Sequence, residues 1–200
     1  MKTNKYTATA VLDVDGVLAD FESAACEAFG YKNRHLYDFS QRYPQYDPGL
    51  IEEWVNLEDN YHNLSPIFGG ILLFQQLKSK GFYTILMTSR GEHLRAVTES
   101  WLRLYNLKPD NLIFEKDKAN LIYELNEEAD VVFGRPNITL FVDDSVSQLQ
   151  AVKKLNPSVT CLAWGQEWNT EWFPRLRYEG VNYLIQANIG DGNWKDMWSK

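Results

Sequence analysis

The sequence predicts an α/β fold, a Rossmann-like parallel sheet with helices on both faces and a small helical cap inserted after the first strand. Three observations lead to this prediction. Short apolar, β-branched runs alternate along the chain with segments whose apolar residues recur at helical spacing. The strand-like runs are apolar throughout, which is typical of strands that helices cover on both faces. Between residues 31 and 65 the composition becomes rich in Tyr, Asn, Asp and Pro, which indicates an inserted unit.

The predicted strands are apolar runs that end in polar residues. We expect strands at residues 7–14, 82–88, 111–114, 138–144 and 158–164. Helical segments separate these strands, so right-handed βαβ units and a mainly parallel sheet are expected.

The predicted helices have apolar residues three or four positions apart. They cover residues 17–30, 69–80, 92–106, 118–128 and 146–155, with a shorter helical patch at 51–57. Gly81 is expected to cap the second of these helices. Residues 165–200 show no comparable pattern, and we expect them to form an irregular tail that packs over the sheet.

A chain of 200 residues is long enough for one domain with a small insertion. We assign residues 1–16 and 66–200 to a Rossmann-like core and residues 17–65 to the helical cap. A cap in this position can close over a substrate and control the access of water.

Charge and composition narrow the range of partners. The net charge of −7 argues against an extended nucleic-acid-binding surface. The first ten residues, MKTNKYTATA, lack the apolar core of a signal peptide, and no apolar run approaches the ~20 residues of a membrane span. Cys26 and Cys161 are far apart and are expected to be free thiols. We therefore expect a cytoplasmic protein without a membrane partner, and the sequence leaves its oligomeric state open.

Polar side chains that can carry chemistry follow four of the predicted strands. In chain order they are Asp13 and Asp15, Thr88 to Arg90, Lys116 and Lys118, and Asp143 and Asp144. Ligands of an open parallel sheet bind beyond the carboxyl ends of its strands. The sequence therefore predicts that these side chains gather at one edge of the sheet.

Acids, hydroxyls and a lysine together suit phosphate chemistry. Gathered carboxylates raise one another's pKa unless a cation lies among them, and oxygen ligands without His or Cys suit Mg²⁺. A lysine and a hydroxyl beside that cation can bind phosphate oxygens. One aspartate can attack phosphorus to form an aspartyl-phosphate, and an acid two residues later can protonate the leaving oxygen and then activate water. This chemistry predicts a Mg²⁺-dependent phosphomonoester hydrolase whose partner is a small phosphate ester.

The order of these motifs resembles the haloacid dehalogenase-like phosphatase superfamily. The resemblance rests on D-x-D-G-V-L, a hydroxyl after the second strand, a lysine before a helix and D-D after a later strand. It implies that Asp13 is the nucleophile and Asp15 the general acid and base. It also implies that Thr88 binds phosphate and that Lys118 holds phosphate and nucleophile together, although Lys116 competes for this role.

The same resemblance implies a magnesium site. Its ligands would be Asp13, the backbone carbonyl of Asp15, and Asp143. Asp144 would cap the next helix or hold a water bound to the metal. Ser89 and Arg90, which follow the phosphate-binding threonine, are expected to be neighbours of the phosphate.

A closer resemblance is to the 5'(3')-deoxyribonucleotidases, which remove phosphate from deoxynucleoside monophosphates. It rests on DVDGVLADFE, the helical insertion after it, DK before a helix and the ending NWKDMWSK. Phe21 matches an aromatic residue of their substrate pocket, so a deoxynucleoside monophosphate is the expected substrate. The sequence departs from this group at Arg90, where proline usually follows the hydroxyls.

Other functions would use similar residues. A polynucleotide 3'-phosphatase would need a basic groove, which the net charge of −7 disfavours. A phosphatase for sugars or other small metabolites would need no nucleotide pocket. A phosphoacceptor signalling domain usually places its acid pair first, whereas here the pair D-D comes last. A non-catalytic binding domain would not need to retain all of these groups.

Structural roles are the alternative for each candidate. Thr88 or Ser89 could cap the helix that follows them, as could Asp143 or Asp144. The aromatic residues of the insertion could form the core of the cap instead of stacking on a nucleobase.

Overall fold

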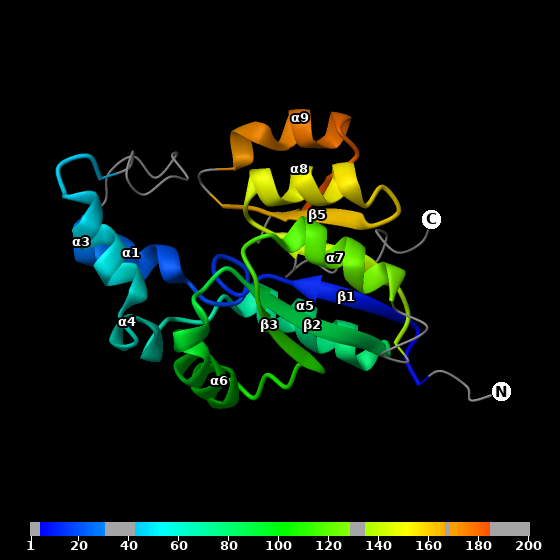
Figure 1. Cartoon of the computed structure of the whole chain (residues 1–200), viewed down its shortest axis with the longest axis horizontal. Coiled ribbons are helices and arrows are strands. Elements are labelled where there is room, and N and C mark those ends of the chain that lie inside the picture. The colour runs from blue at the N-terminus through cyan, green and yellow to red at the C-terminus, as the bar shows by residue number, and fades with distance from the viewer. Residues whose placement is uncertain (1–4, 31–42, 129–134, 167–168, 185–200) are drawn as a thin grey trace.

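The computed structural model describes residues 5–30, 43–128, 135–166 and 169–184 (Figure 1). Part of the predicted cap and the terminal segment NWKDMWSK lie outside these residues.

A six-stranded sheet in the order β3-β2-β1-β4-β5-β6 forms the centre of the molecule. Every neighbouring pair of strands is parallel, which confirms the predicted parallel α/β fold. The strands are β1 (Ala8–Leu12), β2 (Phe82–Thr88), β3 (Asn111–Phe114), β4 (Ile138–Asp143), β5 (Thr160–Trp164) and β6 (Asn182–Leu184).

Helices cover both faces of the sheet, as the continuous apolar strands predict (Figure 1). α5 and α6 pack on one face, and α7, α8 and α9 pack on the other. The helices are α1 (Phe21–Phe29), α3 (Pro48–Asn56), α4 (Asp59–His62), α5 (Phe68–Ser79), α6 (Arg95–Leu104), α7 (Lys118–Glu127), α8 (Val146–Leu155) and α9 (Phe173–Tyr178).

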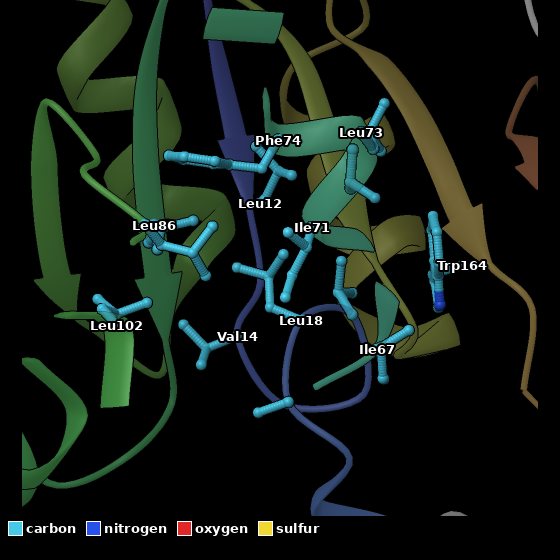
Figure 2. Packing of buried hydrophobic residues seen from close by; sticks show 14 of the residues in the cluster. Leu12, Val14, Leu18, Ile67, Ile71, Leu73, Phe74, Leu86, Leu102 and Trp164 are labelled. Atoms are coloured by element: carbon cyan, nitrogen blue, oxygen red, sulfur yellow. The ribbon is translucent and has the colours of Figure 1, made fainter. Parts of the chain in front are cut away.

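Successive strand residues enter opposite layers of the core because strand side chains alternate in direction. Leu12 and Leu86 belong to the layer that contains Phe74 of α5 (Figure 2). The neighbouring Val11 belongs to the other layer, with Ile122 of α7. Each such fully buried side chain stabilises the folded state by about 1.5–3 kcal/mol, so both layers hold the strand ends in fixed positions.

The first helix begins later than its apolar spacing predicts. The range 17–30 was predicted, but α1 begins at Phe21, after Asp20 accepts a hydrogen bond from the Ser23 amide. Leu18 and Ala19 instead form a tight turn in which both amides donate to the Val14 carbonyl, at 2.8 and 2.9 Å. Both residues are apolar because the core buries them, and in the sequence they extend the apolar spacing of the helix toward its start.

The prediction of an irregular tail is wrong for its described part. A 3₁₀ turn (Thr170–Trp172) is followed by α9 and then by β6, which extends the sheet beyond β5. The strand has only three residues, too few to show a period in the sequence. The predicted helix at 92–106 is likewise divided into a 3₁₀ turn (Glu92–Leu94) and α6.

The inserted unit has a small aromatic core of its own. Phe29, Tyr43 and Ile51 form this core, with Trp54 packed against it. In Figure 1, α1 and α3 lie beyond the carboxyl end of β1, where a cap would cover a site. The assignment of residues 17–65 to a cap stays a proposal.

In the part of the chain that the structure describes, no helix combines the length and the apolar character that crossing a membrane requires.

Candidate active site

The predicted site residues lie at the carboxyl edge of the sheet because the central strands end in register. Leu12 pairs with Leu86 of β2 and with Val142 of β4. The next residue after β1 is therefore level with the ends of both neighbours. Asp13 follows β1, and Asp143 is the last residue of β4.

Three buried carboxylates converge at this edge. One oxygen from each of Asp13, Asp143 and Asp144 lies within 4.8 Å of the others. Lys118, which is 1% exposed, lies between two of them. Its Nζ is 2.9 Å from Oδ1 of Asp13 and 2.7 Å from Oδ2 of Asp143.

Lys118 is placed here by the start of α7. Asp117 caps this helix by accepting a hydrogen bond from the Asn120 amide, so the helix begins at Lys118. Lys116, the alternative phosphate ligand, is exposed. Between the two lysines, the structure brings only Lys118 to the carboxylates.

One ammonium does not balance three buried carboxylates, and the pKa values reflect this imbalance. Burial raises the pKa of Asp13 to about 7; the nearby Lys118 opposes this shift, and Asp143 adds to it. Burial, together with Asp143 and Asp13, also raises the pKa of Asp144. Burial alone would lower the pKa of Lys118, but its two carboxylate partners outweigh burial and raise it.

This donor set fits a magnesium ion. The ligands are oxygens, the cluster has excess negative charge, and carboxylates with phosphate and water are the usual environment of protein-bound Mg²⁺. Asp13, Asp143 and Asp144 would hold the ion. The predicted contribution of the Asp15 backbone carbonyl stays a prediction, and the side chain of Asp15 is not part of the cluster.

The side chain of Asp15 instead pairs with Arg90. The guanidinium donates two hydrogen bonds to the carboxylate, from Nε at 2.8 Å and from Nη2 at 2.6 Å. Its Nη1 donates to Oγ1 of Thr98 on α6 at 2.8 Å. Burial would lower the pKa of Arg90, but Asp15 outweighs burial and raises it. Arg90, predicted as a phosphate neighbour, is therefore a permanent cation bound to the predicted acid and base.

The structure argues against capping roles for the other candidates. Ser145, not Asp143 or Asp144, caps α8 by accepting from the Gln148 amide. The 3₁₀ turn after β2 has no side-chain cap, although Thr88 and Ser89 precede it. Thr88 is buried at the strand end, and Ser89 is exposed.

An aromatic row connects the inserted unit to Asp15. Phe21 stacks on Tyr61 with 5.5 Å between ring centroids and 17° between planes, and it also contacts Trp54 at 5.4 Å. The guanidinium of Arg90 lies 4.4 Å from the centre of the Tyr61 ring. Phe21 thus reaches the site through Tyr61 and Arg90.

Searches by sequence and by structure gave different results. No family model and no curated protein matches the sequence. A chain of the Pnkp1/Rnl/Hen1 complex is similar in structure, at 15% sequence identity and a TM-score of 0.50. The similar region covers 80% of this chain but only 47% of that chain. A dehalogenase matches at 16% identity and a TM-score of 0.60, over 96% of this chain and 97% of its own.

A haloacid dehalogenase-like family hydrolase from Streptococcus pneumoniae matches at 13% identity and a TM-score of 0.60, over 92% of this chain and 97% of its own. The chain has the haloacid dehalogenase-like fold. This result confirms the predicted fold and shows that the resemblance holds at the level of the fold.

Sequence reasoning on this haloacid dehalogenase-like fold missed two residues of the site. Thr98 lies on the buried side of α6, and a hydroxyl on an otherwise apolar helix face was the available signal. The sequence does not distinguish Tyr61 from the other aromatic residues of the insertion. Its contact with Arg90 depends on the distance between two separate segments, which the sequence does not specify.

Gly16 allows the first loop of the candidate site to turn beside Asp144. Its φ is +76°, and a Cβ atom here would lie 2.4 Å from Oδ2 of Asp144. We expect Gly16→Ala to displace Asp144 and to cost about 1–3 kcal/mol of unfolding free energy, measured by urea denaturation. Gly30→Ala is the matched control, because Gly30 also has a positive φ but no atom of the described residues lies within 4 Å of its Cβ position. Equal losses in the two variants would contradict the proposed contact.

Proposed function

We propose that this protein is a Mg²⁺-dependent phosphomonoester hydrolase that forms an aspartyl-phosphate on Asp13. The observation that carries the proposal is the convergence of Asp13, Asp143 and Asp144, the first two of which also contact the buried Lys118. These groups come from three segments that are far apart in the sequence, and the gathering of the carboxylates in the interior is costly without a cationic ligand. The haloacid dehalogenase-like fold is consistent with hydrolase chemistry.

Asp13 is held in a position suited to attack. Its Oδ1 accepts hydrogen bonds from Lys118 at 2.9 Å and from the Val14 amide at 2.7 Å. Both bonds fix the same oxygen, so Oδ2 is the atom that we propose attacks phosphorus. The P–O bond to the alcohol breaks as the bond to Asp13 forms.

Lys118 and the proposed metal site neutralise the phosphate. A bound Mg²⁺ would supply charge for the equatorial phosphate oxygens and orient the ester. The ammonium of Lys118 remains beside Asp13 and can contact a phosphate oxygen in the same region. Thr88 at the end of β2 provides a hydroxyl for a further phosphate oxygen.

Asp15 would move the protons. Its side chain is 26% exposed, so a leaving alcohol or a water molecule can reach it. In the first half of the reaction Asp15 takes a proton from solvent and gives it to the leaving oxygen. In the second half it takes a proton from the water that attacks phosphorus, which releases phosphate and regenerates the Asp13 carboxylate. The two hydrogen bonds from Arg90 fix the orientation of Asp15.

A nucleoside monophosphate is the substrate class that we favour. Phe21 and Trp54 are partly exposed, and Phe21 stacks on the buried Tyr61 beside Arg90. The two partly exposed rings place flat apolar surface near Asp15, where the organic part of a phosphate ester would lie. The resemblance to 5'(3')-deoxyribonucleotidases supports the same choice. A cytoplasmic location fits such a substrate and stays a prediction.

A phosphate-release screen tests this proposal. The purified protein is incubated with Mg²⁺ and with nucleoside monophosphates, sugar phosphates and 3'-phosphorylated oligonucleotides. We expect repeated turnover, fastest with deoxynucleoside monophosphates. Turnover of sugar phosphates or oligonucleotides alone would contradict the substrate assignment, and no turnover of any phosphate ester would contradict the hydrolase assignment.

Removal of the metal should abolish activity, and the binding of Mg²⁺ should weaken at low pH. We expect EDTA to stop phosphate release and added Mg²⁺ to restore it. Because the pKa of Asp13 is raised to about 7, protons compete with the cation below that pH. Mg²⁺ should therefore raise the melting temperature more at pH 8 than at pH 6, as measured by calorimetry. Full activity in EDTA would refute the metal-dependent mechanism.

A further inference from the structure

The loop after β5 bonds to both loops that carry the carboxylate cluster. Asn169 is fully buried, and its Nδ2 donates to the carbonyls of Asp144 and Trp164, both at 2.7 Å. Gln166 donates from Nε2 to the carbonyl of Gly16 at 2.6 Å. One short loop thus holds the segment after β1 and the segment after β4.

The two side chains belong to one hydrogen-bonded unit. Oδ1 of Asn169 accepts from the amide of Gln166 at 2.8 Å, and the amide of Asn169 donates to the carbonyl of Gln166 at 3.2 Å. The carbonyl of Asn169 accepts from the amide of Trp172 at 3.0 Å. Displacement of the Asn169 side chain therefore releases the backbone that carries the Gln166 side chain.

The two anchored carbonyls lie where the carboxylate-bearing loops meet. Gly16 is three residues after Asp13, and its Cα packs directly against the carboxylate of Asp144. Buried like charges repel one another, so these loops tend to separate unless other contacts hold them. Neither Gln166 nor Asn169 belongs to the carboxylate cluster itself.

We propose that Gln166 and Asn169 are positioning residues that set the affinity of the carboxylate cluster for Mg²⁺. They fix the spacing between Asp13 and Asp144 by holding the loop that follows Asp13, at Gly16, and the backbone of Asp144 itself. The inference rests on the proposed function, because it assumes that the cluster binds Mg²⁺. Removal of a hydrogen bond that orients a metal ligand without touching the metal typically weakens metal binding by about 10–100-fold.

Calorimetric titration with Mg²⁺ alone tests the inference without measuring activity. We expect Asn169→Ala to weaken Mg²⁺ binding by about 10-fold or more. Asn126→Ala is the matched control. Its Oδ1 accepts from the Ile138 amide at 2.7 Å, so it also anchors backbone of β4, but at the amino end of that strand. This control should lose stability with unchanged Mg²⁺ affinity.

A second variant keeps the test decisive if Asn169→Ala does not fold. Gln166→Ala removes a partly exposed side chain and only one bond to the Gly16 carbonyl, and it should also weaken Mg²⁺ binding. Wild-type affinity in a folded variant at position 166 or 169 would overturn the positioning role and leave the proposed function intact. Failure of the wild-type protein to bind Mg²⁺ would overturn both.

Discussion

Asp13→Asn is expected to lower kcat by about 10⁴-fold or more while the protein remains folded. The amide has nearly the same shape as the carboxylate, and its oxygen can still accept the hydrogen bond from the Val14 amide. The amide is a far weaker nucleophile, however, because it carries no negative charge and its nitrogen lone pair is delocalised into the carbonyl group. Loss of one buried negative charge also relieves repulsion within the cluster, so we expect an unchanged or higher melting temperature.

The measurement combines steady-state phosphate release with calorimetry. Asp110→Asn is the matched control, because Asp110 also pairs with a lysine, Lys78, at 2.8 Å, but at the amino end of β3. This second variant should lose stability and retain kcat. A kcat for Asp13→Asn within tenfold of the wild-type value would exclude Asp13 as the nucleophile.

The parallel sheet is the reason that the sequence predicts so much of the site. Parallel strands bring their carboxyl ends to one edge, so Asp13 and Asp143 can be expected together although 129 positions separate them. The position of Lys118 follows from the start of α7, which Asp117 caps. These predictions need only the order and direction of the elements, which periodicity indicates.

Contacts that depend on a side-chain conformation could not be predicted in the same way. Arg90 follows a strand that ends at the site, so phosphate binding was a reasonable prediction for it. Its actual partner is Asp15, and the choice depends on the distance between two loops and on Thr98 behind the guanidinium. Gln166 and Asn169 carry no sequence signal, because amide side chains in a loop are common and their bonds go to backbone atoms.

The departure from the deoxyribonucleotidase pattern at position 90 has a structural consequence. Proline, which usually occupies this position in that group, could not donate hydrogen bonds to a carboxylate. Here the arginine joins Asp15 to Tyr61 of the inserted unit, through two hydrogen bonds and the face of the ring. The position of the inserted unit and the orientation of the proposed acid are thus linked through one side chain.

Lys118→Met should lower the free energy of unfolding more than any other substitution named above. The side chain is buried, and its ammonium bonds to Asp13 and Asp143, so methionine would fill the volume but leave the carboxylates without this cation. Removing one partner of a buried ion pair typically costs about 3–5 kcal/mol. We expect a loss of this size at pH 8 without Mg²⁺, together with a decrease in kcat of about 10²–10³-fold.

The pH dependence of this loss identifies its cause. Lys118 lowers the pKa of Asp13 against the effect of burial, so the substitution should raise that pKa above its present value of about 7. A carboxyl group with a raised folded-state pKa is protonated in the folded protein at low pH, and its stabilising contribution is lost as the pH rises through that pKa. Urea denaturation should therefore show a smaller deficit at pH 5 than at pH 8. Lys116→Met, two residues away and exposed, is the control that should change neither stability nor kcat. A deficit for Lys118→Met that is independent of pH would show that lost packing, not unbalanced charge, destabilises the protein.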